Sequence, residues 1–128
     1  MSSPIRPGLH HIALTVTDLD TSNPWYERVF GITLKMEVPH PGGTGKILAD
    51  DDMNLVFALH RHDANEGETF AETRTGLDHI GLAVPSRADL ESWQAHLDTQ
   101  GVNRSPMANQ PCTQSPIEDR FFGSILVF

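Results

Sequence analysis

Two nearly identical phrases, LHHIALTV at 9–16 and LDHIGLAV at 77–84, constrain this chain more than any other feature. The second phrase follows the first at an offset of 68 residues, and Trp25 and Trp93 repeat that offset. Two sequence matches at the same offset indicate a duplicated unit. Because a unit of about 60 residues buries too little surface to be robust alone, we expect the 128 residues to form one domain from two modules.

The alternation of residue types within each phrase is typical of a β-strand with one apolar face. The branched residues of each phrase lie on one side, where they can pack against a helix. The histidines His11 and His79 share the other side with small residues only: Ala13 and Thr15 in the first copy, Gly81 and Ala83 in the second. Small neighbours leave open space in front of each imidazole.

Each phrase precedes a segment with the pattern of an α-helix. In the first copy Asp20 or Thr21 is predicted as N-cap and Gly31 as the end, and in the second Ser86 opens a capping box and Gly101 ends the helix. Apolar residues at helical spacing give each helix a stripe: Trp25, Val29 and Phe30 in the first, and Leu90, Trp93 and Leu97 in the second.

Strand patterns follow in the first unit near 33–38, 46–49 and 54–60, separated by a glycine turn at 40–43 and an acidic turn at 50–52. The first unit is therefore predicted to be βαβββ. The second unit continues through a proline-rich stretch to GSILVF at 123–128, which repeats GKILAD at 45–50. We expect its last strand, the counterpart of NLVFALH, to be absent from this chain and to require roughly 10 to 20 further residues in the natural protein.

The charge balance disfavours polyanionic partners. Seventeen acidic against nine basic residues give a formal net charge of -8, which works against nonspecific binding to nucleic acid or to an anionic membrane. The single cysteine, Cys112, cannot form an internal disulfide, and no apolar run approaches the roughly 18 residues of a membrane span. We expect a cytoplasmic protein with a small-molecule partner.

Two histidines on equivalent strands of two equivalent units can be brought together by a pseudo-twofold packing. A lone histidine would more often be a strand residue bonded to a neighbour, but duplication reverses that preference. We predict that the imidazoles of His11 and His79 point into one pocket and hold a divalent metal such as Zn, Fe, Ni or Mn.

The strings HHIALTVTDLD and DHIGLAV, each opening such a unit, resemble the vicinal oxygen chelate superfamily. This superfamily includes glyoxalase I, bleomycin and fosfomycin resistance proteins, methylmalonyl-CoA epimerase and the extradiol dioxygenases. The resemblance implies the glyoxalase-like fold: an α+β chain of two βαβββ modules in a curved mixed sheet with a pseudo-twofold axis. Module one would cover about 7–62, a linker 63–75, and an incomplete module two about 76–128.

The resemblance also implies the ligand set. It assigns His11 and His79 as metal ligands and expects a glutamate on the last strand of the second module, beyond Phe128. The corresponding place in the first module is Ala58, which cannot coordinate, and this favours the two-histidine, one-carboxylate pattern of the dioxygenases. Relatives commonly pair, so a homodimer is expected.

His60 and His62 lie in the segment LHRH and share strand parity with Ala58. They are candidate catalytic acid/base residues or replacement ligands, or alternatively a solvated strand end. His10 has the opposite parity to His11 and is interpreted as a structural or surface residue.

The sequence therefore predicts a metal-dependent enzyme acting on a small substrate through two adjacent oxygens, with the metal as Lewis acid. The isomerase or lyase branch and the extradiol dioxygenase branch both stay open. The alternative is a metal-free small-molecule binding protein of the bleomycin-resistance type, against which the matched histidines argue.

Overall fold

The computed structural model describes residues 2–103 and 121–124 of the chain. They belong to two compact units, Met1–Thr69 and Phe70–Phe128, and the division falls inside the segment 63–75 that was predicted as a linker. Cys112 and most of the strand predicted at 123–128 lie outside the described residues.

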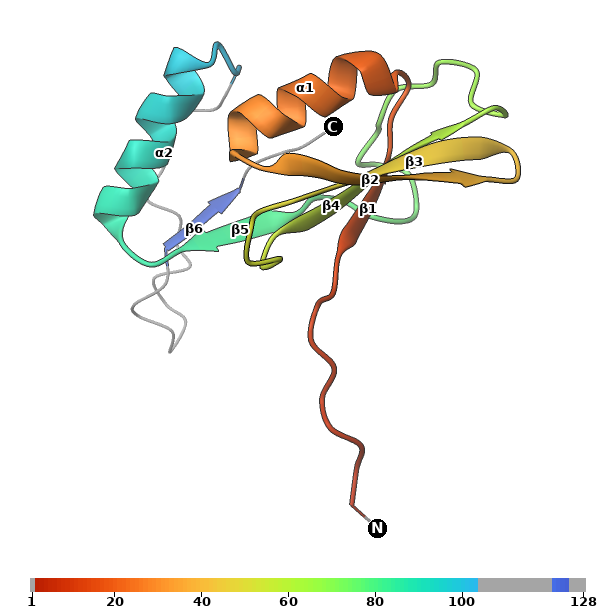
Figure 1. Ribbon diagram of the computed structural model, residues 1–128. Helices are drawn as coiled ribbons and strands as arrows, with labels where there is room; N and C mark the ends of the chain where they lie inside the picture. The colour runs from red at the N-terminus through yellow and green to blue at the C-terminus, as the bar shows by residue number, and fades with distance from the viewer. Residues whose placement is uncertain (1, 104–120, 125–128) are drawn as a thin grey trace. The chain divides into compact units, whose positions relative to one another are not determined.

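The first unit is a four-stranded mixed sheet with one helix, and Figure 1 shows the helix lying across one face of the sheet. The strand order is β1-β4-β3-β2; β1 and β4 run parallel, and the other neighbours run antiparallel. The predicted βαβββ order is confirmed. Its elements are β1 (Ile12–Thr15), α1 (Leu19–Phe30), β2 (Thr33–His40), β3 (Gly43–Ala49) and β4 (Val56–His62).

The core of this unit lies between α1 and the sheet. Phe57 of β4 is fully buried, and its ring centroid lies 5.6 Å from that of Tyr26 and 5.2 Å from that of Phe30. Tyr26, which the sequence stripe omitted, is more deeply buried than Trp25, because it stands three and four positions before Val29 and Phe30 on the sheet side of the helix. The aromatic packing fixes α1 over β4.

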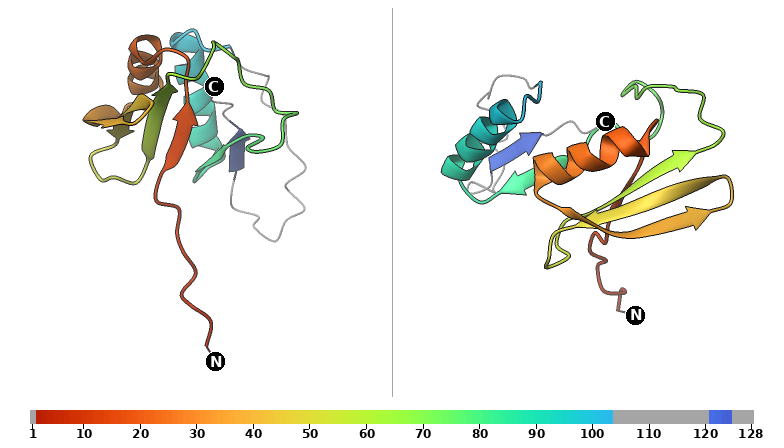
Figure 2. Two further views of the ribbon diagram at one scale, coloured as in Figure 1. Left: turned by 90° about the vertical axis from the view of Figure 1, so that its right-hand side faces the viewer. Right: turned by 45° about the horizontal axis from the view of Figure 1, so that its top comes forward.

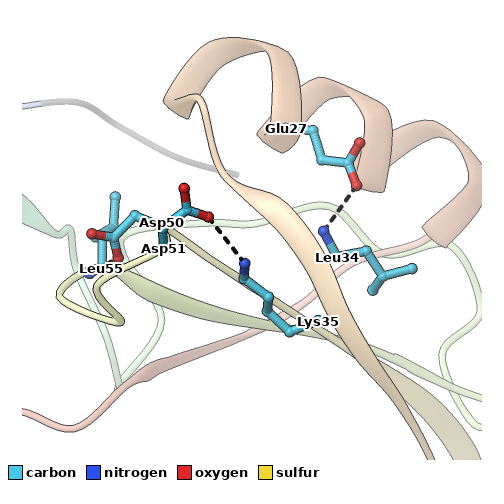
Figure 3. Close-up of polar contacts among 6 residues, drawn as sticks. All are labelled: Glu27, Leu34, Lys35, Asp50, Asp51 and Leu55. Atoms are coloured by element: carbon cyan, nitrogen blue, oxygen red, sulfur yellow. Dashed lines mark hydrogen bonds and ion pairs between the residues drawn. The ribbon is translucent and has the colours of Figure 1, made fainter.

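Side-chain carboxylates accept hydrogen bonds from backbone amides at the start of α1 and at the start of β2. The helix begins after Asp18, whose carboxylate accepts from the Asp20 amide, so the predicted cap at Asp20 or Thr21 was wrong by two residues or more. Figure 3 shows the Glu27 carboxylate accepting from the Leu34 amide at 3.2 Å, which ties α1 to the start of β2.

One carboxylate of the acidic turn between β3 and β4 holds the turn in shape. The Asp50 carboxylate accepts from the Leu55 amide at 2.8 Å, and the Lys35 ammonium lies 3.4 Å from an Asp51 carboxylate oxygen (Figure 3). Asp50 therefore shapes the turn, while the fully exposed Asp51 contributes little to stability.

The described part of the second unit consists of β5 (Gly81–Val84), α2 (Arg87–Thr99) and β6 (Phe121–Ser124). Figure 2 shows α2 running beside this two-stranded sheet. The predicted cap at Ser86 is confirmed, since its hydroxyl accepts from the Asp89 amide at 3.1 Å.

The end of α2 is also as the sequence predicted. Gly101 has φ 69°, and the Val102 amide donates to the Leu97 carbonyl at 2.9 Å, which satisfies one of the last carbonyls of the helix.

The strand pairing of the two units differs in the described residues. β1 pairs parallel with β4, whereas β5 pairs directly and antiparallel with β6. Both strands also begin later than the phrases predicted, so His11 stands immediately before β1 and His79 two residues before β5.

Candidate functional site

His11 is exposed at the edge of the first unit's sheet, directly before β1. Its Nδ1 atom lies 2.8 Å from Nδ1 of His10, with the two rings edge to face at 5.1 Å. One of these nitrogens donates and the other accepts. Within residues 2–103, the Nε2 atom of His11 makes no hydrogen bond, so it is available to a ligand.

His79 occupies the equivalent position in the second unit and is also exposed. Its Nδ1 atom lies 2.6 Å from a carboxylate oxygen of Asp78. Because a carboxylate can only accept, Nδ1 carries the proton and Nε2 of the neutral ring is bare. A carboxylate bonded to the rear nitrogen is the arrangement that orients histidine ligands in metal sites.

The small residues beside both histidines lie on exposed faces, as the alternation predicted. Ala13 and Thr15 are exposed in β1, and Gly81 and Ala83 are exposed in β5, while the aliphatic residues between them are partly buried. Ala13 pairs with Ala58, and Thr15 pairs with His60 on the neighbouring strand. This side of β1 therefore continues onto β4 through the buried Ala58 and reaches His60.

Three imidazoles gather at one end of this side of the sheet. His60 and His62 come from β4, and His40 comes from the end of β2; Gly43 of β3 lies between them, paired with both His40 and His62. The His40 and His60 rings lie 5.2 Å apart, and the His40 and His62 rings 5.3 Å apart. Sequence reasoning placed His40 in a turn and missed it, although the two-residue hairpin loop after it already fixed its position opposite Gly43.

The environment of His60 favours its neutral form. Partial burial lowers the pKa of His60, and the nearby imidazoles of His40, His62 and His11 lower it further, since a second positive charge there would be repelled. His60 therefore keeps an unprotonated nitrogen at neutral pH. His62 is exposed, as a solvated strand end would be.

Among residues 2–103 and 121–124, no three His, Cys, Asp or Glu side chains converge into a metal site. His11 belongs to the first unit and His79 to the second, so their shared metal site stays a prediction. Taken one at a time, both imidazoles have the exposure and the engaged rear nitrogen that suit a ligand.

Residues 8–115 match the Glyoxalase/Bleomycin resistance protein/Dioxygenase superfamily, and the chain belongs to this family. The predicted family and the glyoxalase-like α+β fold are thus confirmed. No curated protein sequence matches the chain. Neither described helix is long and apolar enough to cross a membrane.

Solved structures agree with this assignment. A glyoxylase/bleomycin resistance protein/dioxygenase domain from Frankia sp. EAN1pec is 29% identical with a TM-score of 0.74, and the match covers 83% of this chain and 78% of that one. The fold is shared with SMU.1112c, at 18% identity and a TM-score of 0.63 over 93% and 98% of the two chains. It is also shared with the fosfomycin resistance protein FosX from Listeria monocytogenes, at 16% identity and a TM-score of 0.57 over 83% and 77%.

Proposed function

We propose that this protein is a metal-dependent enzyme of its superfamily that acts on a small substrate bound through two adjacent oxygens. The observation that carries the proposal is the matched state of His11 and His79. Each stands just ahead of the first strand of its unit, is exposed, and has its Nδ1 atom engaged while Nε2 is left for a ligand. A solvated surface histidine needs no such repeated arrangement.

In this proposal His11 and His79 hold the metal, and Asp78 orients His79. A divalent metal of the Fe, Zn, Ni or Mn group suits neutral imidazole ligands and, when bound, supplies Lewis-acid polarisation of substrate oxygens. A crystal structure of a FosX variant holds Mn(II) and 1S,2S-dihydroxypropylphosphonic acid, so Mn(II) is included among the metals to test.

His60 and His62 supply the acid/base chemistry. The lowered pKa of His60 keeps its imidazole neutral, which is the state a general base requires. The lone pair of His60 takes a proton from the bound substrate, and exposed His62 exchanges protons with water. Ala13 pairs with Ala58 across β1 and β4, and Thr15 pairs with His60 two residues further along the same strands.

The first experiment measures metal binding. The purified chain, stripped with a chelator, is titrated with Mn(II), Zn(II), Ni(II) and Fe(II), and affinity is compared among variants. His11→Ala and His79→Ala are expected to abolish binding, and Asp78→Asn to weaken it by about 10–100-fold, since it removes the carboxylate behind a ligand. The matched control is Asp63→Asn, which removes an exposed carboxylate that pairs only with Arg61 in the described residues. Unchanged affinity in the two histidine variants would overturn the proposal.

The branch of chemistry is then decided by the reaction. Oxygen uptake with a catechol in the iron form selects the dioxygenase branch, and turnover without oxygen uptake in the zinc or nickel form selects the isomerase or lyase branch. Tight binding of a small molecule by a chain that takes up none of these metals would replace the proposal with the sequestering alternative.

We also propose a homodimer, because open sheets leave edge strands that a second copy can cover. β2 lies at one edge of the first unit's sheet and carries exposed Leu34 and Met36. Light scattering at micromolar concentration is expected to give twice the mass of 14.1 kDa. A single species at the monomer mass would contradict it.

A further inference from the structure

The backbone carbonyl of Pro41 fixes the tautomer of His40. Nδ1 of His40 lies 3.1 Å from that oxygen. A carbonyl oxygen only accepts, so Nδ1 carries the proton, and Nε2 of the neutral His40 ring is left as an acceptor.

The tautomer of His40 in turn determines the tautomer of His60. Nδ1 of His60 lies 3.2 Å from Nε2 of His40. Since Nε2 of His40 has no proton when the ring is neutral, Nδ1–H of His60 must be the donor. The proton of His60 is therefore on Nδ1, and its Nε2 atom carries the lone pair.

The glycines of β3 make room for this pair of rings. A Cβ atom added to Gly45 would lie 2.6 Å from Cε1 of His60, and one added to Gly43 would clash first with the Arg61 carbonyl oxygen and lie 2.7 Å from Cε1 of His40. Both positions are closer than real Cβ contacts allow. Gly45 therefore makes room for the His60 ring, and Gly43 makes room for the Arg61 carbonyl as well as for the His40 ring.

We propose that His40 is a positioning residue that holds His60 in one neutral tautomer, with Nε2 presented as the proton acceptor. This inference rests on the proposed role of His60 as a base. In the reaction the substrate C–H or O–H bond breaks, its electron pair stays on the substrate, and the proton forms a new bond to Nε2 of His60. The resulting imidazolium keeps its Nδ1–H donated to Nε2 of His40, while the Nδ1–H group of His40 donates to the Pro41 carbonyl.

The test reads the tautomer directly. The full chain is labelled with 15N in its histidines and stripped of metal, and long-range 1H–15N spectra at neutral pH report which ring nitrogen of His60 is protonated. We expect the Nδ1–H form in the wild type and its loss in His40→Leu, which offers no acceptor. His40→Gln should restore it, because the amide oxygen can accept from Nδ1–H.

A second pair of variants changes no titratable group. Gly45→Ala is expected to displace the His60 ring and abolish the Nδ1–H signature. Its matched control, Gly81→Ala, is a strand glycine with nothing within 4 Å of the added Cβ, and should leave the signature intact. Retained backbone amide spectra confirm folding in each case.

The outcomes separate the two proposals. An Nε2–H form of His60 in the wild type, or an Nδ1–H form that survives both His40→Leu and Gly45→Ala, would overturn the role of His40. A chain that binds no metal but shows the expected tautomer and its loss would leave the His40–His60 pair standing and remove the metal-dependent function.

Discussion

The two units share their opening phrase but bury their helices differently. α1 buries Leu19, Tyr26, Val29 and Phe30, whereas the buried residue of α2 is Leu97. At the repeat offset Leu97 replaces Val29, but Gln94 replaces Tyr26 and Asp98 replaces Phe30. The duplication therefore keeps the phrase that contains each histidine and one buried helix position, while the positions of Tyr26 and Phe30 hold polar residues in α2. What is kept concerns the candidate site more than the core.

The largest loss of stability is expected for a substitution in the core of the first unit. Phe57→Ala should lower the free energy of unfolding by about 3–5 kcal/mol, because it leaves a cavity beneath two aromatic rings. Leu97→Ala is the matched variant in the second unit and should lie near the lower end of the roughly 2–5 kcal/mol range for Leu→Ala. Denaturation is followed by Trp25 in a Trp93→Phe background and by Trp93 in a Trp25→Phe background. Identical transitions at both probes in both variants would mean that the units unfold as one body.

Substituting the glycine that ends each helix should lower the free energy of unfolding by similar amounts in the two units, unlike substitutions in their cores. Gly31 and Gly101 have φ 65° and 69°, and an added Cβ meets nothing within 4 Å at either site. Gly31→Ala and Gly101→Ala should each cost about 1–2 kcal/mol from backbone strain alone. Gly8→Ala, also without near neighbours, is the neutral control. Urea denaturation measures all three, and a negligible loss at either helix end would contradict the strained conformation.

A smaller effect is expected for the hydroxyl of Tyr26. This group is buried without a hydrogen-bond partner among the described residues, and burial raises the pKa of Tyr26 far above its usual range. Tyr26→Phe keeps the ring packing and removes a desolvated polar atom, so stability should rise or stay within about 1 kcal/mol of the wild type. A marked loss of stability by thermal denaturation would show that the hydroxyl has a partner.

The smallest expected effect is the loss of stability at acidic pH that comes from His60. The folded pKa of His60 lies below the unfolded value of about 6.5, so the unfolded chain binds a proton first as the pH falls. The contribution of His60 is complete above that pH and is lost as the pH falls toward the lower folded pKa. The melting temperature of the metal-free chain, read by Trp25, should drop over this window, and His60→Gln should flatten the drop. An equal drop in both proteins would assign the acid effect to other groups.

The sequence alone determined the family, the βαβββ order of the first unit, the capping of α2 and the exposed faces beside the two histidines. These follow from short-range patterns: alternation of period two, helical spacing, and glycine where the backbone needs a positive φ. The same patterns placed the starts of both strands too early and the cap of α1 too late, because nearby polar residues compete for these positions and only pairing and hydrogen bonds choose among them.

Tertiary structure alone decided what His40 does. In the sequence it is 20 residues from His60 and reads as part of a turn. The antiparallel pairing of β2 and β4 with β3 brings the two rings to hydrogen-bond distance, with a glycine on β3 as the spacer. Strand register sets which residues are neighbours across a sheet, and the carbonyl of Pro41 sets the protonation of the pair. The hairpin loop in the sequence places His40 opposite Gly43, but the contact of its ring with His60 depends on atoms that meet only after β2, β3 and β4 have paired.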